Sequence, residues 1–218
     1  MTKFYFVRHG KTEWNLEGRY QGAKGDSPLV PQSYQEIAQL GKYLVQIKFD
    51  GIYCSPIKRA RTTAKEIARN IQYQGQVIPV DAFREFNLGK MEGMKFTAVA
   101  EEYPAELDGF RHHPDKYDPT TIGGETFQEV FARFVPEVKK IAQEYPDGNI
   151  LIVSHGAVLC AAIRNMLGVP LAEIRARGGL ANTSTTILET KDQGASFKCL
   201  AWNKTSYLRR KIDPTDIV

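Results

Sequence analysis

The sequence predicts an α/β fold, a three-layer α/β/α sandwich built on a mostly parallel sheet. Short apolar runs alternate along the chain with amphipathic stretches, which is the pattern of successive βαβ units. The 218 residues suffice for one α/β domain with an insertion, and the hydrophobic (42%) and charged (25%) fractions are ordinary for a soluble globular protein. We therefore expect a single domain spanning residues 1–218.

The expected strands are short apolar runs bounded by polar or turn-forming residues. The first run ends where Arg8 and His9 begin, so a charged pair follows the strand directly. The expected strands cover residues 4–7, 51–54, 76–80, 149–153, 185–188 and 197–202.

Three sequence signals mark where helices are expected to begin. Residues 33–36 and 126–129 both have the Ser/Thr-x-x-Glu spacing of a capping box. Ser55 followed by Pro56 predicts a further helix with the serine as N-cap and the proline in the first position. Pro136 lies inside the helix that starts near residue 126 and should kink or shorten it.

The remaining segments complete the predicted architecture. A mostly apolar helix is expected at residues 157–167, after the fourth strand. Residues 81–125 are less periodic and rich in charged residues, Pro and Gly. We expect this segment to form an inserted, partly helical cap over one end of the sheet.

Cysteine usage, hydropathy and charge exclude several classes of protein. Cys54, Cys160 and Cys199 are odd in number and widely spaced, so we expect buried reduced thiols rather than disulfides or a zinc site. No apolar run can span a bilayer or serve as a signal peptide, which predicts a cytoplasmic protein without a membrane partner. The net charge of +4 is scattered. The basic run at 209–211 is therefore interpreted as a solvated tail, and we expect no nucleic-acid partner.

Polar side chains follow three of the predicted strands. Arg8 and His9 end the first, residues 55–59 follow the second, and residues 154–156 end the fourth. Ligands of open α/β sheets bind outside the carboxyl ends of parallel strands. The sequence therefore predicts that segments far apart in the chain converge on one cleft.

The chemistry of this convergent set favours a phosphate dianion. A guanidinium about 4 Å from a phosphate charge gains roughly 4 kcal/mol at an effective dielectric near 20, before desolvation, so two arginines can replace a metal as the neutralising charge. Nearby cations keep an imidazole deprotonated and able to attack phosphorus. Without ligand spacing for a metal we expect no metal and no cofactor. The set consists of His9, His155, Arg8, Arg59, Asn15 and Gln21.

Residues 8–15, Arg-His-Gly-Lys-Thr-Glu-Trp-Asn, resemble the R-H-G-x-T-x-W-N signature of the histidine phosphatase superfamily, the phosphoglycerate mutase-like proteins. Further segments are similar to that family in the same order: residues 18–29, 55–64, 84–93 and 154–156. The resemblance runs through nearly the whole chain. It implies a phosphatase that acts through a phosphohistidine.

The resemblance also implies roles for single residues. His9 would be the nucleophile, and Arg8, Arg59 and His155 would bind the phosphoryl oxygens. Glu85 would protonate the leaving oxygen and then activate water, and a single carboxyl group can serve both steps. Residues 182–184 would brace the site from behind. The residues expected to bind substrate are Asn15, Gln21, Gly10, Thr12 and Asn182.

Hydrolysis is favoured over a mutase reaction. Mutases of this family typically carry Glu-Ser where this chain has Lys11 and Thr12, and residues 83–89 look closer to the broad-specificity phosphatases. Tyr207 departs from the family at a position where a terminal histidine is common. We expect a phosphomonoesterase of small phosphorylated metabolites. A phosphoglycerate mutase and a non-catalytic phosphate-binding or scaffold module are the alternatives.

The adjacent histidines His112 and His113 do not predict a metal site, because neighbouring residues point apart and no acid or Cys completes a ligand set. We hypothesise instead that Arg111, His112 and His113 line the cap and help to select the substrate. The sequence predicts neither the physiological substrate nor the oligomeric state.

Overall fold

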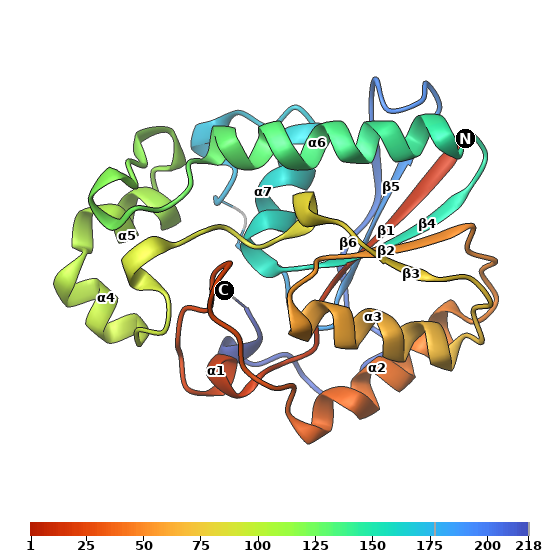
Figure 1. Ribbon diagram of the computed structural model, residues 1–218, viewed down its shortest axis with the longest axis horizontal. Helices are drawn as coiled ribbons and strands as arrows, with labels where there is room; N and C mark the ends of the chain where they lie inside the picture. Colours follow the sequence, from red (N-terminus) through yellow and green to blue (C-terminus); the bar gives the residue numbers. More distant parts are fainter. Residues whose placement is uncertain (177, 218) are drawn as a thin grey trace.

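The computed structural model describes residues 1–176 and 178–217, within which six strands form one sheet (Figure 1). The strand order is β3-β2-β4-β1-β5-β6. Neighbours among β3, β2, β4 and β1 are parallel, whereas β5 is antiparallel to β1 and to β6. The predicted, mostly parallel sheet is therefore confirmed. The strands are β1 (Thr2–Arg8), β2 (Gly51–Cys54), β3 (Val77–Pro79), β4 (Asn149–Ser154), β5 (Thr185–Thr190) and β6 (Lys198–Lys204).

The central strand β1 contributes side chains to two cores, one on each face of the sheet. Phe4 and Phe6 belong to one hydrophobic cluster, and Tyr5 and Val7 belong to the other. This alternation is what a strand buried on both faces requires. Each such side chain contributes roughly 1.5–3 kcal/mol through burial.

Helices cover both faces of the sheet, so the three-layer prediction is confirmed (Figure 1). Residues of α6 and α7 pack into the cluster that contains Phe4, and residues of α2 and α3 into the cluster that contains Tyr5. The longer helices of the two outer layers are α2 (Pro31–Leu44), α3 (Lys58–Asn70), α6 (Phe127–Glu144) and α7 (Gly156–Met166).

Two predicted helix starts are wrong. Helix α2 begins at Pro31, because a proline fits the first turn, and Ser33 instead donates a 2.7 Å hydrogen bond to the carbonyl of Lys11. Helix α3 begins at Lys58 without a side-chain cap. Ser55 is not its cap, because its hydroxyl lies 2.7 Å from Nε2 of His155 and is used in the site described below.

The predicted capping box of α6 is confirmed. Thr126 Oγ1 accepts from the Glu129 amide at 3.1 Å, and the Glu129 carboxylate accepts from the Thr126 amide at 2.8 Å. The prediction that Pro136 shortens the helix is wrong, since α6 continues to Glu144. Phe134 and Val138, on either side of the proline, are fully buried against the core. Their packing offsets the roughly 3 kcal/mol that an internal proline costs.

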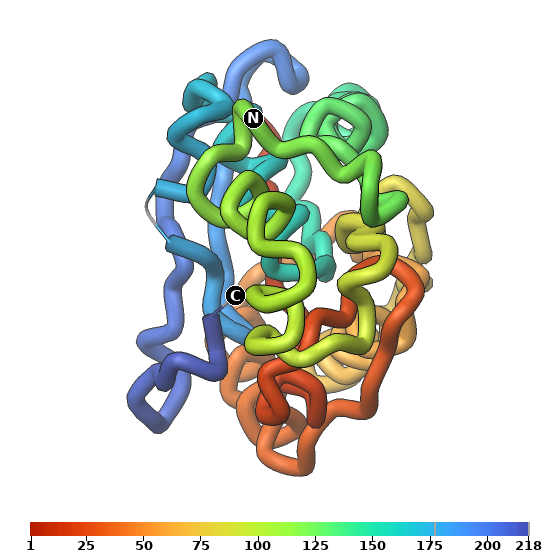
Figure 2. Tube along the Cα trace, turned by 90° about the vertical axis from the view of Figure 1, so that its left-hand side faces the viewer, coloured from red at the N-terminus to blue at the C-terminus, as the bar shows by residue number. Residues whose placement is uncertain are grey.

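The expected helical insertion lies beyond the carboxyl ends of the parallel strands (Figure 1), and Figure 2 shows it in front of the sheet. Aromatic rings fasten it to the domain: Phe110 lies 5.3 Å from Phe86 and 5.8 Å from Phe127, between ring centroids. Its elements are η1 (Asp81–Phe83), η2 (Gly89–Met91), α4 (Phe96–Glu102), α5 (Pro104–Arg111), η3 (Pro114–Lys116) and η4 (Thr120–Ile122).

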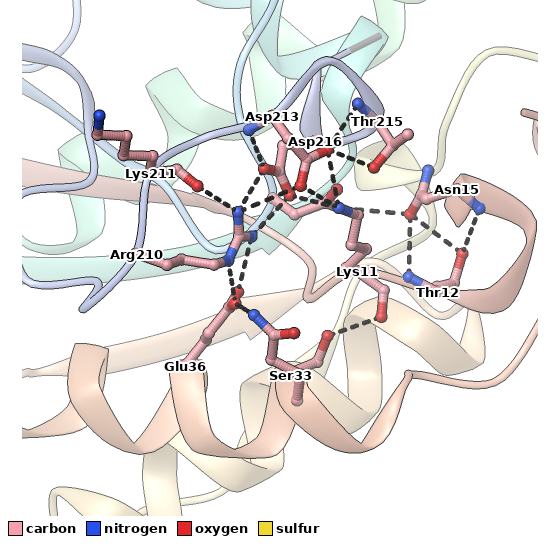
Figure 3. A network of polar contacts seen from close by, with 12 residues as sticks. Lys11, Thr12, Asn15, Ser33, Glu36, Arg210, Lys211, Asp213, Thr215 and Asp216 are labelled. Carbon is pink, nitrogen blue, oxygen red and sulfur yellow. Dashed lines mark hydrogen bonds and ion pairs between the residues drawn. The ribbon is translucent and has the colours of Figure 1, made fainter.

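The basic run near the C-terminus is only in part a solvated tail. Arg209 and Lys211 are exposed, but Arg210 forms ion pairs with the carboxylates of Glu36 at 2.6 Å and Asp216 at 2.5 Å (Figure 3). The interpretation fails for Arg210 because the chain turns back at η6 (Pro214–Asp216) and buries Asp216 beside it. We name Lys11, Glu36, Arg210, Asp213 and Asp216 the C-terminal charge cluster.

The three cysteines are free thiols. Cys54 and Cys160 are buried as expected, whereas Cys199 is only partly buried. Within residues 1–176 and 178–217, no helix combines the length and hydropathy needed to cross a membrane.

Candidate active site

His9 follows β1 and lies beside side chains from α3 and from the end of β4. Nε2 of His9 is 3.2 Å from Nε of Arg59, and the His9 and His155 rings are 5.2 Å apart between centroids. The parallel arrangement of β1, β2 and β4 brings these residues together, because the turn after each strand opens at the same edge of the sheet.

The hydrogen bonds of His9 identify its reactive nitrogen. Nδ1 donates to the carbonyl of Gly10 at 2.8 Å, since a carbonyl can only accept. Nε2 therefore carries a lone pair and accepts from Arg59. Burial, followed by the charges of Arg59 and Arg8, lowers the pKa of His9 well below its usual value. The ring is a neutral imidazole whose Nε2 is a nucleophile.

Arg8 is held by backbone carbonyls rather than by a carboxylate. Its Nη1 donates to the carbonyls of Leu180 and Asp216, both at 2.5 Å, and its Nε is buried with no hydrogen-bond partner. Burial lowers the pKa of Arg8 to about 10, so the group is charged at neutral pH. A Cβ at Gly156 would lie 3.0 Å from Arg8 Nε, so this glycine lets the guanidinium lie against the start of α7.

Arg59 joins His9 to the loop after α1 (Glu13–Leu16). Besides its bond to His9, it donates to the carbonyls of Gly22 and Gly25, both at 2.8 Å, and to Asp26 at 3.1 Å. Burial lowers its pKa, and nearby carboxylates oppose that effect. The guanidinium is thus held beside Nε2 of His9.

His155 is completely buried behind His9. Its Nε2 lies 2.7 Å from Ser55 Oγ, and its Nδ1 has no hydrogen-bond partner. Burial is the main cause that lowers its pKa well below the usual value, so this ring is also neutral. His155 does not line the cavity that His9 lines.

The Glu85 carboxylate is bound at the first turn of α7. Its oxygens accept from the amides of Val158 at 2.8 Å and Ala157 at 3.1 Å, and from the amide of Phe86 at 3.0 Å. Free amides and the helix dipole favour an anion at such an N-terminus. Glu85 is therefore held in one position, facing the same cavity as both arginines.

The expected substrate-binding residues divide into two layers. Asn15 and Gln21 line the cavity. Thr12 and Asn182 are fully buried behind it: Thr12 accepts from Gln21 at 2.9 Å, and Asn182 donates to the carbonyl of His9 at 3.1 Å. A Cβ at Gly10 would lie 3.0 Å from the Ser33 Cβ, so this glycine allows the chain after β1 to pack closely against α2.

The cavity itself is small. Its volume of about 40 Å³ corresponds to roughly three waters at ~10–15 Å³ each, which suits a phosphoryl group. No group of three or more metal-ligating side chains occurs among residues 1–176 and 178–217. The lining residues include Arg8, His9, Asn15, Tyr20, Gln21, Arg59, Glu85 and Phe110.

Sequence reasoning missed three residues that hold the site. Ser55 contacts His155, Asp26 binds Arg59, and the carbonyl of Asp216 accepts from Arg8. Ser55 and Asp26 lie inside the segments that carry the family resemblance, so their positions could have indicated a role in the site. No sequence pattern could have indicated Asp216, because it contacts Arg8 through its backbone carbonyl.

Comparison with known proteins agrees with this geometry. Residues 4–205 match the family model of the histidine phosphatase superfamily (branch 1). The chain is 30% identical to phosphoserine phosphatase 1 of Hydrogenobacter thermophilus, over 88% of this chain and 89% of the relative. It is 35% identical to the probable phosphoglycerate mutase GpmB of Salmonella paratyphi A, over 81% and 80%.

The solved structure of YhfR from Bacillus stearothermophilus superposes with a TM-score of 0.88 at 30% identity, covering 95% of this chain and 99% of that one. Sequence signature, family model and fold agree over nearly the whole chain, and relatives over most of it are named as phosphatases. The chain belongs to the histidine phosphatase superfamily, and it is a phosphatase.

Proposed function

We propose that the protein hydrolyses phosphomonoesters of small metabolites in two displacements, through a phosphohistidine at Nε2 of His9. One observation carries the proposal: the unprotonated Nε2 lies at a cavity of phosphoryl size beside two guanidinium groups and one carboxyl group. The positive charge on Arg8 and Arg59 takes the neutralising role that a metal ion has in other phosphatases.

In the first displacement, Nε2 of His9 attacks phosphorus while the bond to the ester oxygen breaks. The Nε–H of Arg59, which now donates to Nε2, turns to a phosphoryl oxygen once the substrate is bound. The leaving alkoxide takes a proton from Glu85 in its acid form. Nδ1–H of His9 remains bonded to the Gly10 carbonyl and stabilises the positive charge that develops on the ring.

In the second displacement, the Glu85 carboxylate accepts a proton from water as the water oxygen attacks phosphorus. The bond from nitrogen to phosphorus breaks, which releases inorganic phosphate and the free imidazole. The amides of Ala157 and Val158 keep the carboxylate in place between the two steps. Glu85 ends protonated, ready for the next ester.

The experiment is rapid acid-free quenching of His9→Ala and of the unaltered protein with a radiolabelled phosphate ester. We expect the unaltered protein to carry an alkali-stable, acid-labile phosphoryl group, and the variant to carry none and to lose at least about 10³-fold in kcat. Circular dichroism checks that the variant is folded. Turnover near that of the unaltered protein would rule out the mechanism.

A mutase reaction is the second candidate, favoured by the 35% identity to the probable phosphoglycerate mutase. A mutase returns the phosphoryl group to a second hydroxyl of the same product, whereas a hydrolase passes it to water. Incubation with isotopically labelled 3-phosphoglycerate separates the two, since the mutase yields the labelled 2-isomer and the hydrolase yields glycerate and inorganic phosphate.

A further inference from the structure

A second cavity lies beside the catalytic pocket, between the end of α5, the loop after η5 (Leu171–Glu173) and the C-terminal turn. Its volume is about 570 Å³, enough for part of a metabolite. Among the residues that the structure describes, its lining contains Arg111, His112 and Arg175 and no carboxyl group. The described lining of this cavity therefore carries positive charge.

Within the described residues, part of the Arg175 guanidinium has no hydrogen-bond partner. Its Cζ lies 5.4 Å from the centroid of the Phe110 ring, and its Nη1 is buried without a hydrogen bond. None of the ion pairs found within residues 1–176 and 178–217 involves it. A buried donor without an acceptor is costly, and such a group in a native protein points to a ligand or an ordered water.

Arg111 packs against two aromatic rings that contact each other. Its Cζ is 5.4 Å from the centroid of Tyr20 and 5.2 Å from that of Phe96. In the described part of the chain it too lacks a carboxylate within ion-pair distance. A guanidinium that packs against ring faces can still donate from its in-plane N–H groups to an anion.

The rings that hold these arginines are also walls of the catalytic pocket. Tyr20 and Phe110 line the pocket of His9, and the guanidinium groups of Arg111 and Arg175 pack against the same two rings. Burial is the main cause that lowers the pKa of Arg8, and the charge of Arg175 contributes to the same effect. When the phosphoryl group of a substrate fills the catalytic pocket, the rest of the substrate must lie outside that pocket.

We propose that Arg175 and Arg111 bind a second anionic group of the substrate, a carboxylate. The preferred substrates are then small phosphomonoesters with two anionic groups. This inference rests on the proposed function, because it assigns the distal part of the molecule whose phosphoryl group His9 receives.

The experiment compares two matched pairs of substrates that differ in a carboxylate: phosphoserine with phosphoethanolamine, and 3-phosphoglycerate with glycerol 3-phosphate. We expect the unaltered protein to favour the carboxylate member of at least one pair in kcat/KM. In Arg175→Gln and Arg111→Gln, that ratio falls about 10- to 100-fold, the effect of losing a charge-assisted hydrogen bond. Arg175→Lys retains part of the preference.

Arg69→Gln is the matched control, since Arg69 is an exposed arginine of α3 (76% exposed side chain) paired only with Glu66. Its ratio stays that of the unaltered protein. Equal losses on both members of a pair would show a structural role for Arg175 and overturn the inference. So would the absence of any preference in the unaltered protein.

A further outcome separates substrate binding from an effector site. If free malonate changes the rate on phosphoethanolamine without competing with it, the cavity takes a separate molecule and the inference is wrong. Failure of the inference leaves ester hydrolysis intact. Failure of the proposed function would instead appear as the absence of hydrolysis for all four esters.

Discussion

Two buried groups of charged residues meet at Arg8, and they are built in opposite ways. In the C-terminal charge cluster the cations are paired with carboxylates: Arg210 binds Glu36 and Asp216, and Lys11 Nζ lies 3.0 Å from Asp216 and 3.1 Å from Asp213 (Figure 3). The cluster has two cations and three carboxylates, so both cations are paired. Such a cluster fixes the chain and leaves no positive charge for an anion.

In the catalytic pocket the arginines are fixed mainly by neutral groups. Arg8 donates to the carbonyls of Leu180 and Asp216, and Arg59 donates to two glycine carbonyls besides Asp26. A carbonyl holds a guanidinium in one orientation without cancelling its charge. Backbone carbonyls thus orient the guanidinium groups of the pocket and leave their positive charge for an anion.

The two groups are joined through Asp216. Its carboxylate belongs to the C-terminal charge cluster, while its backbone carbonyl accepts from Arg8 and from the amide of Asn182 at 3.1 Å. The C-terminal charge cluster therefore holds in place a backbone carbonyl that orients Arg8 in the pocket. Variants of the pocket should mainly lose catalytic activity, whereas variants of the C-terminal charge cluster should mainly lose stability.

The largest effect is expected for Arg59→Gln, which removes charge from the pocket. We expect kcat/KM for phosphate esters to fall about 10²- to 10³-fold or more, as when a donor to a transition-state oxyanion is lost. The melting temperature should fall less than for the Arg210 variant described below, because the substitution also removes a buried charge that its one ion pair, with Asp26, compensates only in part. Steady-state kinetics and calorimetry on one preparation test both parts. A large loss of stability with retained activity would contradict the distinction.

Arg210→Ala should show the reverse pattern. Removing this guanidinium leaves Glu36 and Asp216 buried without their main cation, which costs about 3–5 kcal/mol in the free energy of unfolding. The loss of kcat below the melting temperature should be smaller than for Arg59→Gln, since Arg8 keeps the carbonyl of Leu180. Urea denaturation and kinetics measure the two effects.

Arg209→Ala is the control for that variant. Arg209 is the exposed neighbour, and the hydrogen bond found for it, from its backbone amide to Gln39 Oε1 at 3.0 Å, survives the substitution. Its unfolding free energy should stay within about 0.5 kcal/mol of the unaltered protein. Similar losses for both arginines would mean that the basic run acts as a whole and not through the ion pairs of Arg210.

The catalytic pocket is more visible in the sequence than the C-terminal charge cluster. Parallel strands bring their carboxyl ends to one edge, so Arg8, His9 and Arg59 were predictable as neighbours from the strand pattern alone. The family resemblance added Glu85, which the pattern could not distinguish from nearby acids. The three-layer architecture and the approximate positions of the strands were predicted from the alternation of apolar runs and amphipathic stretches.

The C-terminal charge cluster was hidden because no local rule governs it. Arg210 lies in a basic run that is usually solvated, and Glu36 fits a capping box that the structure does not form. Their contact joins residues 174 positions apart and depends on where the C-terminal turn packs. The cap predicted at Ser55 is wrong because α3 begins only at Lys58, and the contact of the Ser55 hydroxyl with His155 is a tertiary one that no local pattern predicts.

The smallest effect concerns pH, which separates the two groups by the range in which each loses stability. Burial tends to raise the pKa of Asp216, but hydrogen bonds from Arg210, the Asp213 amide and Lys11 hold it at about 2. Because the folded pKa lies below the unfolded value of about 3.8, the folded state binds fewer protons and the stabilisation is present above about pH 4. It is lost as pH falls towards about 2 and amounts to roughly 2 kcal/mol.

The imidazoles of His9 and His155 change the stability of the protein at higher pH than Asp216 does. The folded pKa values of His9 and His155 lie well below 6.5, so the unfolded chain takes up protons first and stability declines as pH falls below about 6.5. Urea denaturation from neutral pH to about pH 2.5 should therefore show two declines in the unaltered protein. In Asp216→Asn the lower decline should shrink while the upper one remains, since the substitution leaves both rings in place. Loss of the upper decline instead would show that the two groups titrate as one, and that the neutral pocket depends on the charge of Asp216.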